Sequence, residues 1–595
     1  MNSREISQQL ILPHGGKLVN LLTEGQERRE LLQRAKGLPS IQISIRSVCD
    51  LELMATGAFS PLDRFMGERD YKTVLSDMRM FDGTLMPIPV TLPIDSVDGL
   101  VVGAEVVLRS PMNDILAVML LEELFAWDRD VECKAVLGTT DSRHTLVSEM
   151  HGWGRYLVSG PLKVVNFPRH NDFRNVRRTP AEVRLLLQAL HRTNVIAYQP
   201  RHPMHRAHET LTKAAAAEVG GSLLIQPVVG ITGHDDLAHY TRVRCYEALF
   251  ENYYDPGETL LNLIPLAVRM AGPRAGLWHG IINRNYGANY FIIGRDPHGP
   301  GNDSQGRSFY ASHEVQELFR AHEAELGVQM IPHREMVYLP GNNRYEESDR
   351  VVHGKEEFMR VSATTVMEDS LFRGKRLPEW FTYPEVSQIL FDAYPPKTSQ
   401  GFCIWLTGLP SSGKSTIADV LAPLLLSSGR RVTVLDGDVV RTHLTKGLGF
   451  SKEDRITNIL RVGFVAAEVV RHEGVVICAL ISPFASARDQ VRAMVGGDRF
   501  IEVFVDTPVS VCEVRDVKGM YTMAKQGRIT GFTGVDDVYE PPRSPELCID
   551  TVAATPEESA RTVLEVLVKK GFLTFVEKRA KQRIPQAGAM QAVRS

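Results

Sequence analysis

The chain has 595 residues, 43% hydrophobic and 23% charged, so it is globular and too long for a single core, and we expect two to four domains. Its formal net charge of −3 gives no general field for nucleic acid or an anionic membrane, so any basic site must be local. The seven cysteines are scattered and include no C-x-x-C pair, which argues against a disulfide framework or a zinc site. No apolar run reaches membrane-spanning length and the first ten residues are polar, which predicts a cytoplasmic protein.

Residues 1–165 alternate short apolar runs with turn residues, as in 86–92 and 101–108. This pattern predicts a mostly β domain with a few helices. From about residue 166 the pattern changes to alternating strands and helices, which begins with the apolar run 195–198. We therefore expect a second domain of the α/β type.

The run at 195–198 ends in Gln-Pro-Arg-His-Pro-Met-His-Arg-Ala-His, residues 199–208. If a helix begins around Pro203, His205 and His208 lie on one face of its first turn, where helix N–H groups favour an anion. Neutral or protonated imidazoles there are suited to hydrogen-bond the α-phosphate of a triphosphate without a metal ligand. The alternative for this pair is a helix-capping or surface role.

Four further segments carry basic or loop-forming residues near expected strand ends: 226–230, 240–244, 269–274 and 294–301. The last of them follows an apolar strand at 290–293. Glycine and proline after a strand usually mean only a loop. In an α/β sheet, however, ligands bind at the carboxyl ends of the strands, and several basic side chains converge there.

Together these stretches resemble ATP sulfurylase, the sulfate adenylyltransferase family, over roughly residues 10–390. The resemblance implies a β-rich, PUA-like N-terminal domain (1–165), a Rossmann-like nucleotidyltransferase domain (166–327) and a small α/β subdomain (328–390). It also implies attack of sulfate on the α-phosphorus of MgATP, giving adenosine 5′-phosphosulfate (APS) and pyrophosphate. By resemblance, Gln199 and Arg201 contact sulfate, His205 and His208 contact the ATP phosphates, and Arg295 contacts the reacting anion.

The chain departs from this family inside the same site. The family usually reads Gln-Thr-Arg-Asn-Pro, and here Pro200 and His202 replace the threonine and the asparagine. Pro297 occupies a histidine position, with His298 one residue late, and Gly233 and Met367 occupy positions that usually carry lysine and arginine. Because these changes remove hydrogen-bonding and cationic groups, we predict weak or absent sulfurylase activity and a retained scaffold that supports assembly or regulation.

Residues 391–400 have linker character, with a Pro-Pro pair and a polar run. An apolar strand at 402–407 then leads into Gly-Leu-Pro-Ser-Ser-Gly-Lys-Ser, which fits the phosphate-loop pattern, and apolar residues follow at helical spacing. The loop N–H groups and the helix are expected to cradle ATP phosphates, with Lys414 on the outer phosphates and Ser415 on Mg²⁺. The expected ATP-binding residues are Gly408, Leu409, Pro410, Ser411, Ser412, Gly413, Lys414, Ser415 and Thr416. The alternative is a glycine-rich turn with a solvated lysine.

A second strand at 431–435 ends in Asp436-Gly437-Asp438, where carboxylates can hold Mg²⁺ or orient a hydroxyl nucleophile. Further strands at 475–481 and 500–505 predict a doubly wound parallel sheet. The spacing of Arg455, Asn458 and Arg461 places them on one helical face, which suits recognition of phosphate or sulfate. An exposed ion-pairing face is the commoner explanation of such spacing alone.

Residues 401–566 resemble APS kinase, which transfers the ATP γ-phosphate to the 3′-hydroxyl of APS. Val439 for the usual asparagine and Leu460 for an arginine are the small differences. The resemblance implies that Asp438 orients or deprotonates the hydroxyl and that Asp436 lies on the Mg²⁺ side, although these two roles could be exchanged. It implies an APS site in which Phe450 and Phe532 sandwich the adenine, with core packing as the alternative for both rings. The implied APS-binding residues are Arg441, Phe450, Arg455, Asn458, Arg461, Ile481, Ser482, Lys518, Phe532 and Thr533.

The leading hypothesis is an APS kinase (401–575) fused to a degenerate sulfurylase-like part, with Lys414, Asp436 and Asp438 catalytic and a basic, disordered tail at 576–595. The first alternative is an enzyme with both activities, and the second is an N-terminal part that only binds nucleotide or assembles the protein. The expected partners are ATP with Mg²⁺ and APS, with sulfate as a further candidate, and neither nucleic acid nor membrane. Relatives of this type form homo-oligomers, including hexamers.

Overall fold

The structure is a computed structural model that describes residues 9–231, 239–294, 302–303, 306–311, 313–351, 357–516, 518–529 and 531–574. Its contacts divide the chain into two compact units. The first unit comprises residues 1–366 and 377–390, and the second comprises residues 367–376 and 391–595.

The first 165 residues form two small sheets and several helices. Their elements are α1 (Gly25–Ala35), β1 (Ser40–Gln42), α2 (Ile45–Ala55), α3 (Glu68–Asp77), β2 (Leu92–Ile94), β3 (Glu105–Arg109), β4 (Ile115–Leu120), β5 (Glu123–Ala126), α4 (Arg129–Glu132), α5 (Thr145–His151), β6 (Tyr156–Ser159) and β7 (Leu162–Val164). One sheet has the order β1-β3-β4-β7 and the other, antiparallel throughout, has the order β2-β6-β5. The predicted β character is therefore present, with more helix than the sequence pattern indicated.

The two apolar runs that supported the β prediction are only partly strands. Residues 86–92 are buried, but only Leu92 belongs to a strand, because Pro87 and Pro89 have no N–H group to donate to a ladder. In the run 101–108, β3 begins at Glu105, while Val101 and Val102 are exposed. In these two runs, apolar residues are therefore a poor guide to strand pairing: some are buried outside a strand, and two are exposed.

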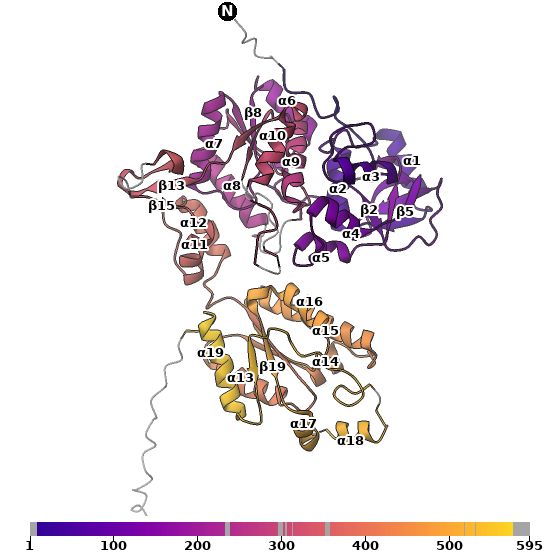
Figure 1. Ribbon diagram of the computed structural model, residues 1–595, viewed down its shortest axis with the longest axis vertical. Helices are drawn as coiled ribbons and strands as arrows, with labels where there is room; N and C mark the ends of the chain where they lie inside the picture. Colours follow the sequence, from indigo (N-terminus) through magenta and orange to yellow (C-terminus); the bar gives the residue numbers. More distant parts are fainter. Residues whose placement is uncertain are drawn as a thin grey trace, which may run out of the picture. The chain divides into compact units, whose positions relative to one another are not determined.

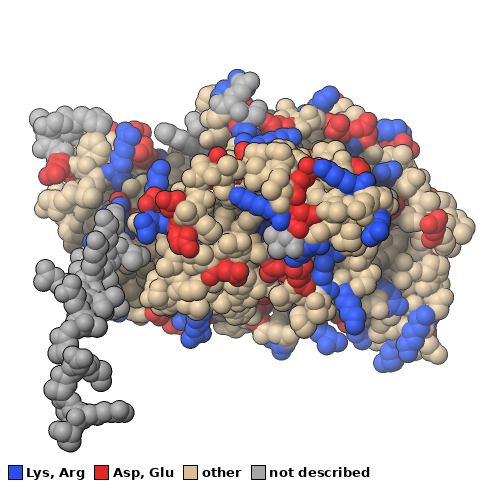
Figure 2. All heavy atoms as spheres, turned by 90° about the horizontal axis from the view of Figure 1, so that it is seen from below, with Lys and Arg blue, Asp and Glu red and all other residues tan. Residues whose placement is uncertain are grey.

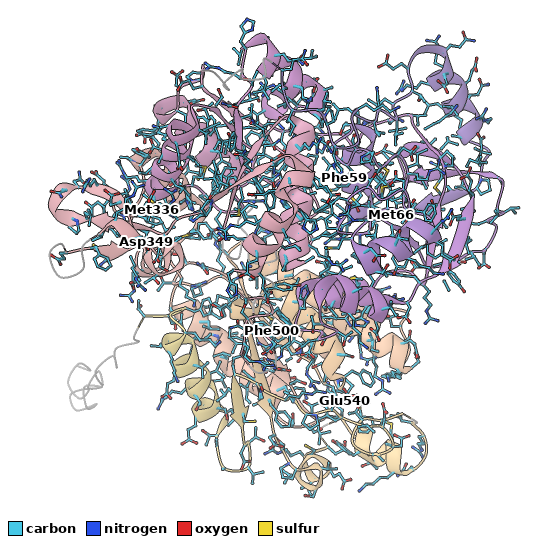
Figure 3. All side chains as sticks on the ribbon, turned by 45° about the horizontal axis from the view of Figure 1, so that its top comes forward. Phe59, Met66, Met336, Asp349, Phe500 and Glu540 are labelled. Carbon is cyan, nitrogen blue, oxygen red and sulfur yellow. The ribbon has the colours of Figure 1, made fainter. Side chains whose placement is uncertain are left out.

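The next part of the first unit is a five-stranded parallel sheet with helices. Its elements are α6 (Pro180–Ala189), β8 (Val195–Tyr198), α7 (Arg206–Val219), β9 (Ser222–Ile225), α8 (His239–Tyr253), β10 (Thr259–Leu261), α9 (Gly272–Tyr286), β11 (Tyr290–Ile293), α10 (Glu314–Leu326) and β12 (Gln329–Pro332). The order is β10-β9-β8-β11-β12, and the strands predicted at 195–198 and 290–293 are confirmed. This sheet shares one core with the N-terminal part, since Phe59, labelled in Figure 3, lies 5.0 Å from Trp278 of α9 between ring centroids.

A small antiparallel sheet follows, in the order β14-β13-β15. The elements of this region are β13 (Met336–Leu339), β14 (Arg344–Glu347), β15 (Met359–Arg360), α11 (Ala363–Asp369) and α12 (Pro384–Ala393). Trp380, just before α12, stacks on Tyr338 of β13 with ring centroids 5.2 Å apart. The segment leading into α12 is thereby fixed to the small sheet.

The second unit contains the predicted doubly wound parallel sheet, in the order β17-β18-β16-β19-β20 (Figure 1). Its elements are β16 (Phe402–Thr407), α13 (Lys414–Ser427), β17 (Val432–Asp436), α14 (Gly437–His443), α15 (Lys452–Arg471), β18 (Val475–Ala479), α16 (Ala485–Val495), β19 (Phe500–Val505), α17 (Val509–Arg515), α18 (Met520–Lys525), β20 (Leu547–Ile549) and α19 (Pro556–Lys569). Side chains of β16 alternate between two cores, with Ile404 packed among α13 and α19 and Trp405 packed among α15 and α16. The central strand is therefore buried on both faces, as its continuous apolar run predicts.

Two observations concern the expectations that the protein binds neither nucleic acid nor a membrane. In the view of Figure 2, Lys and Arg side chains are interspersed with Asp and Glu, in keeping with the small net charge. Across the described ranges, none of the helices is long and apolar enough to cross a membrane.

Candidate active sites

The phosphate loop lies between the central strand β16 and helix α13, and two of its glycines are required by geometry. Gly408 has φ of 151°, and a Cβ there would lie 2.5 Å from the Val505 carbonyl oxygen. Gly413, at φ of 106°, is the N-cap of α13. The Lys414 side chain is buried, and its Nζ donates to the carbonyls of Gly408 and Leu409 at 3.0 and 2.7 Å. Burial lowers the pKa of Lys414 to about 8.

The two carboxylates at the end of β17, Asp436 and Asp438, have different partners. Asp436 Oδ2 accepts the Ser415 hydroxyl at 2.6 Å, and its Oδ1 accepts the Asp438 backbone N–H at 3.1 Å. Asp438 instead pairs with Lys518. A hydroxyl and a carboxylate held together fit Mg²⁺, which takes one or two protein carboxylates and fills its shell with water and phosphate oxygens. The described ranges contain no cluster of three or more His, Cys, Asp or Glu residues suited to a metal.

A cavity of about 580 Å³ opens beside the loop and brings most predicted kinase residues together. Predicted residues that line it are Pro410, Ser411, Gly413, Lys414, Ser415, Thr416, Asp436, Asp438, Arg441, Phe450, Arg455, Asn458, Ile481, Ser482, Lys518, Phe532 and Thr533. Gly408, Leu409 and Ser412 shape the loop without lining the cavity. Arg461 is exposed on α15 and does not line it, because each i, i+3 step drifts by about 60° around the helix, which turns Arg461 roughly 120° away from Arg455. An APS contact by Arg461 therefore rests on the resemblance alone.

Part of the cavity lining is cationic and aromatic. Arg455 donates to Thr533 Oγ1 at 3.0 Å and pairs with Asp537, which joins α15 to the segment after α18. Arg441 lies over the Phe450 ring, 4.4 Å from its centroid. Phe450 is 54% exposed while Phe532 is 6% exposed and packs edge-on against Tyr521, so the two rings differ in freedom to move onto a base.

Ser482 is held in a strained backbone conformation at the edge of this cavity. Its φ is 40°, in the left-handed region that non-glycine residues rarely adopt. Its hydroxyl accepts the Trp405 indole N–H and donates to Thr407, and its carbonyl accepts from Arg488 Nη1 at 2.6 Å. These bonds direct the hydroxyl into the protein, so any ligand contact at this position comes from the backbone around Ile481 and Ser482.

The sequence did not single out three lining residues on the far side of the loop: Arg515, Thr551 and Ser559. Arg515 donates to the Ser412 carbonyl and to Thr551 Oγ1, which ties α17 to the loop and to the end of β20. The Ser559 hydroxyl is buried and, among the described residues, has no hydrogen-bond partner. Thr551 follows a strand, so the rule that ligands bind at carboxyl ends would have found it once the three-residue β20 was recognised.

The second candidate site lies at the carboxyl end of β8 in the first unit. Helix α7 begins at Arg206, slightly later than predicted, with His205 as its N-cap and His208 in its first turn. The two rings lie 3.9 Å apart, as the i, i+3 spacing predicted, and Phe381 stacks on His205 at 4.6 Å. His208 Nδ1 accepts the His205 backbone N–H at 3.3 Å, so the neutral ring carries its proton on Nε2.

Side chains of helices α8 and α9 form hydrogen bonds with residues 199–202. His279 of α9 bonds the Gln199 side chain, Arg242 of α8 donates to the Arg201 carbonyl at 2.7 Å, and the Tyr246 hydroxyl donates to the His202 carbonyl at 2.7 Å. The backbone of this loop is thus fixed, while the His202 side chain is exposed. Arg295, Pro297, His298 and Gly233 lie outside the described residues, and Met367 lies in α11.

The histidines predict a loss of stability of the first unit in weak acid. Burial lowers the pKa of His205 and of His279 to about 3, so the unfolded chain binds more protons than the native one between pH 3 and 6.5. The two histidines therefore contribute their full share to the free energy of unfolding above about pH 6.5. This free energy falls as the pH decreases, by roughly 2–3 kcal/mol for the pair at pH 5.5. This is checked by unfolding the protein in urea at pH 7.5 and at pH 5.5 and monitoring the first unit by hydrogen exchange.

A matched pair of variants separates this effect from general acid sensitivity. His205→Asn is expected to flatten the pH dependence, whereas the exposed His191 is expected to be replaceable by Asn without change. Equal stability of the wild type at both pH values would contradict the prediction.

The phosphate loop and its cavity define a P-loop domain of the phosphotransferase type, preceded by an α/β domain with a parallel sheet. Three family descriptions match the chain: a PUA-like domain at 11–167, ATP-sulfurylase at 174–393 and adenylylsulphate kinase at 400–550. The chain therefore belongs to the family that joins ATP sulfurylase and APS kinase domains, which confirms both resemblances.

Similar proteins carry two different names. Sulfate adenylyltransferases of Mycosarcoma maydis and Yarrowia lipolytica are each 41% identical to the chain, over 94% of it and 99% of their own length. The solved structure of a hexameric APS kinase from Thiobacillus denitrificans is 31% identical, with a TM-score of 0.70, and covers 95% of this chain and 100% of its own. These findings give no support to a loss of sulfurylase activity and favour the alternative of two activities.

Proposed function

We propose that the second unit is an adenylylsulfate kinase. The observation that carries this is a single cavity lined by the phosphate loop, by Asp438 and by the cationic and aromatic side chains of Arg441, Arg455 and Phe450. ATP phosphates lie on the loop, and the phosphosulfate of APS lies against the two guanidiniums. Asp438 then accepts the proton of the 3′-hydroxyl as that oxygen bonds the γ-phosphorus and ADP leaves.

Lys414 stabilises the charge on the transferring group, for which it must exchange its loop carbonyls for phosphate oxygens. Ser415 and Asp436 are the residues that would hold Mg²⁺, which would neutralise phosphate charge during the transfer. This division of roles follows from the different partners of the two carboxylates, since Asp436 bonds Ser415 and Asp438 faces Lys518.

We also propose that the first unit is a sulfate adenylyltransferase, which replaces the expectation of weak or absent activity that the altered motifs suggested. It is supported by the names of the relatives matched over almost their whole length, by Gln199 directly after β8, and by the His205 and His208 rings 3.9 Å apart at the start of α7. The neutral His208 offers Nε2–H to an α-phosphate oxygen, which is the donor the transition state needs. Such activity must tolerate all the departures from the family pattern, namely Pro200, His202, Gly233, Pro297 and Met367.

The test measures both reactions on one preparation: ADP production with APS, and sulfate-dependent pyrophosphate production from MgATP. Wild type is expected to show both. Lys414→Met is expected to lose ADP production by about 10²–10³-fold and to keep pyrophosphate production. Kinase turnover without pyrophosphate would refute the adenylyltransferase proposal, and recovery of pyrophosphate by His202→Asn would locate the defect.

We further propose that the protein forms a homo-oligomer. The support is the similar APS kinase of Thiobacillus denitrificans, which is described as hexameric and whose structure covers nearly the whole of this chain. Sedimentation of the full chain tests this, and a monomer at micromolar concentration would refute it.

A further inference from the structure

We propose that His279 is a positioning residue that fixes the Gln199 amide so that its NH₂ group faces a tetrahedral oxyanion, with sulfate as that ion. This inference rests on the proposed adenylyltransferase function and assigns a role to a residue of α9 that the sequence motifs did not indicate. His279 is fully buried, and its Nδ1 lies 2.5 Å from Gln199 Oε1.

The chemistry of this contact determines which atom carries the proton. An amide oxygen only accepts hydrogen bonds, so Nδ1 of His279 must be the donor. Burial, and then the charge of Arg201, lower the pKa of His279 to about 3, so the ring is neutral at physiological pH. Its single proton is therefore committed to Nδ1 and to Gln199.

The orientation of the Gln199 amide and this tautomer are coupled. With Oε1 bound to His279, the amide presents Nε2 on its other side, where it is buried and has no hydrogen-bond partner among the described residues. Rotating the amide by half a turn would place its N–H groups against Nδ1, which would require the His279 proton to move to the other ring nitrogen. An unpartnered buried donor is costly unless a ligand completes it, and a sulfate oxygen is such an acceptor.

His279 is itself held in place by its helix. Asn283, one turn later, donates to the His279 carbonyl at 2.8 Å, and the neighbouring Trp278 packs on Phe59. A donor on a buried helix can hold the amide in one orientation before the ligand arrives, which lowers the entropy lost on binding.

The experiment compares His279→Leu with His279→Asn in the full chain. Asn keeps an N–H donor near the position of Nδ1, whereas Leu removes the donor with similar bulk. Binding of ³⁵S-sulfate is measured by equilibrium dialysis with α,β-methylene ATP present, and the affinity for that nucleotide is measured separately. His279→Leu is expected to weaken sulfate binding at least about tenfold and nucleotide binding less than about twofold. His279→Asn is expected to bind sulfate within about threefold of wild type.

Equal sulfate affinity of His279→Leu and wild type would overturn the proposal, as would equal losses in both variants or no sulfate binding by the wild type. A loss of nucleotide affinity instead would assign the amide to an ATP phosphate and also overturn it. If His279→Leu does not fold, Gln199→Met decides, since removing the amide must produce the same selective sulfate loss. Sulfate binding without pyrophosphate production would leave this inference standing while the proposed adenylyltransferase activity fails.

Discussion

Replacing Asp438 by Asn is expected to lower kcat for APS-dependent ADP production by about 10²–10⁴-fold, the range for losing a general base. Asp438 lines the same cavity as the phosphate loop and Arg441, and Asn keeps its shape but cannot accept the 3′-hydroxyl proton. The KM for ATP is expected to change little, because loop N–H groups and Lys414 hold the phosphates. Steady-state kinetics with each substrate varied in turn checks this.

Asp419 provides the matched control, since it is an exposed carboxylate on α13 in the same unit. Asp419→Asn is expected to keep the wild-type kcat. An unchanged kcat for Asp438→Asn would remove its proposed role, and a rise in the KM for APS alone would make it a binding residue instead.

Replacing Arg488 by Met is expected to destabilise the second unit by about 3–5 kcal/mol, as when one partner of a buried ion pair is removed. Arg488 is 2% exposed and donates to Glu502 at 2.8 Å, to the Ser482 carbonyl at 2.6 Å and to the Glu540 carbonyl at 2.8 Å. Glu540 is labelled in Figure 3. Loss of these bonds leaves buried acceptors unpaired and frees Ser482 from its strained conformation. The urea midpoint for loss of kinase activity measures the effect.

Arg492 is the comparison residue, because it also contacts Glu502 but its side chain is 26% exposed. Arg492→Met is expected to lower the urea midpoint less than Arg488→Met does, since water can replace part of its bonding. An equal or larger loss for Arg492→Met would show that the Ser482 and Glu540 contacts contribute little.

Local patterns were sufficient for much of the second unit. Each of its main features depends on a few neighbouring residues. These features are the apolar run 402–407, the glycines at 408 and 413, and the carboxylates at 436 and 438. A strand, a turn that needs positive φ and a helix N-terminus are decided by neighbouring residues, so strand β16 and the loop were predicted where they occur.

Long-range contacts could not be predicted in the same way. Gln199 and His279 are 80 positions apart, and Arg488 bonds groups on both sides of itself in sequence, including one 52 residues later. Helical spacing linked Arg455 with Arg461 but could not show that the cavity ends before Arg461. The chain by itself determined which residues can do the chemistry, because residue type and local backbone geometry are encoded in adjacent positions. Only the tertiary structure decided which of them meet and which way their polar atoms point, because that depends on packing between elements distant in sequence.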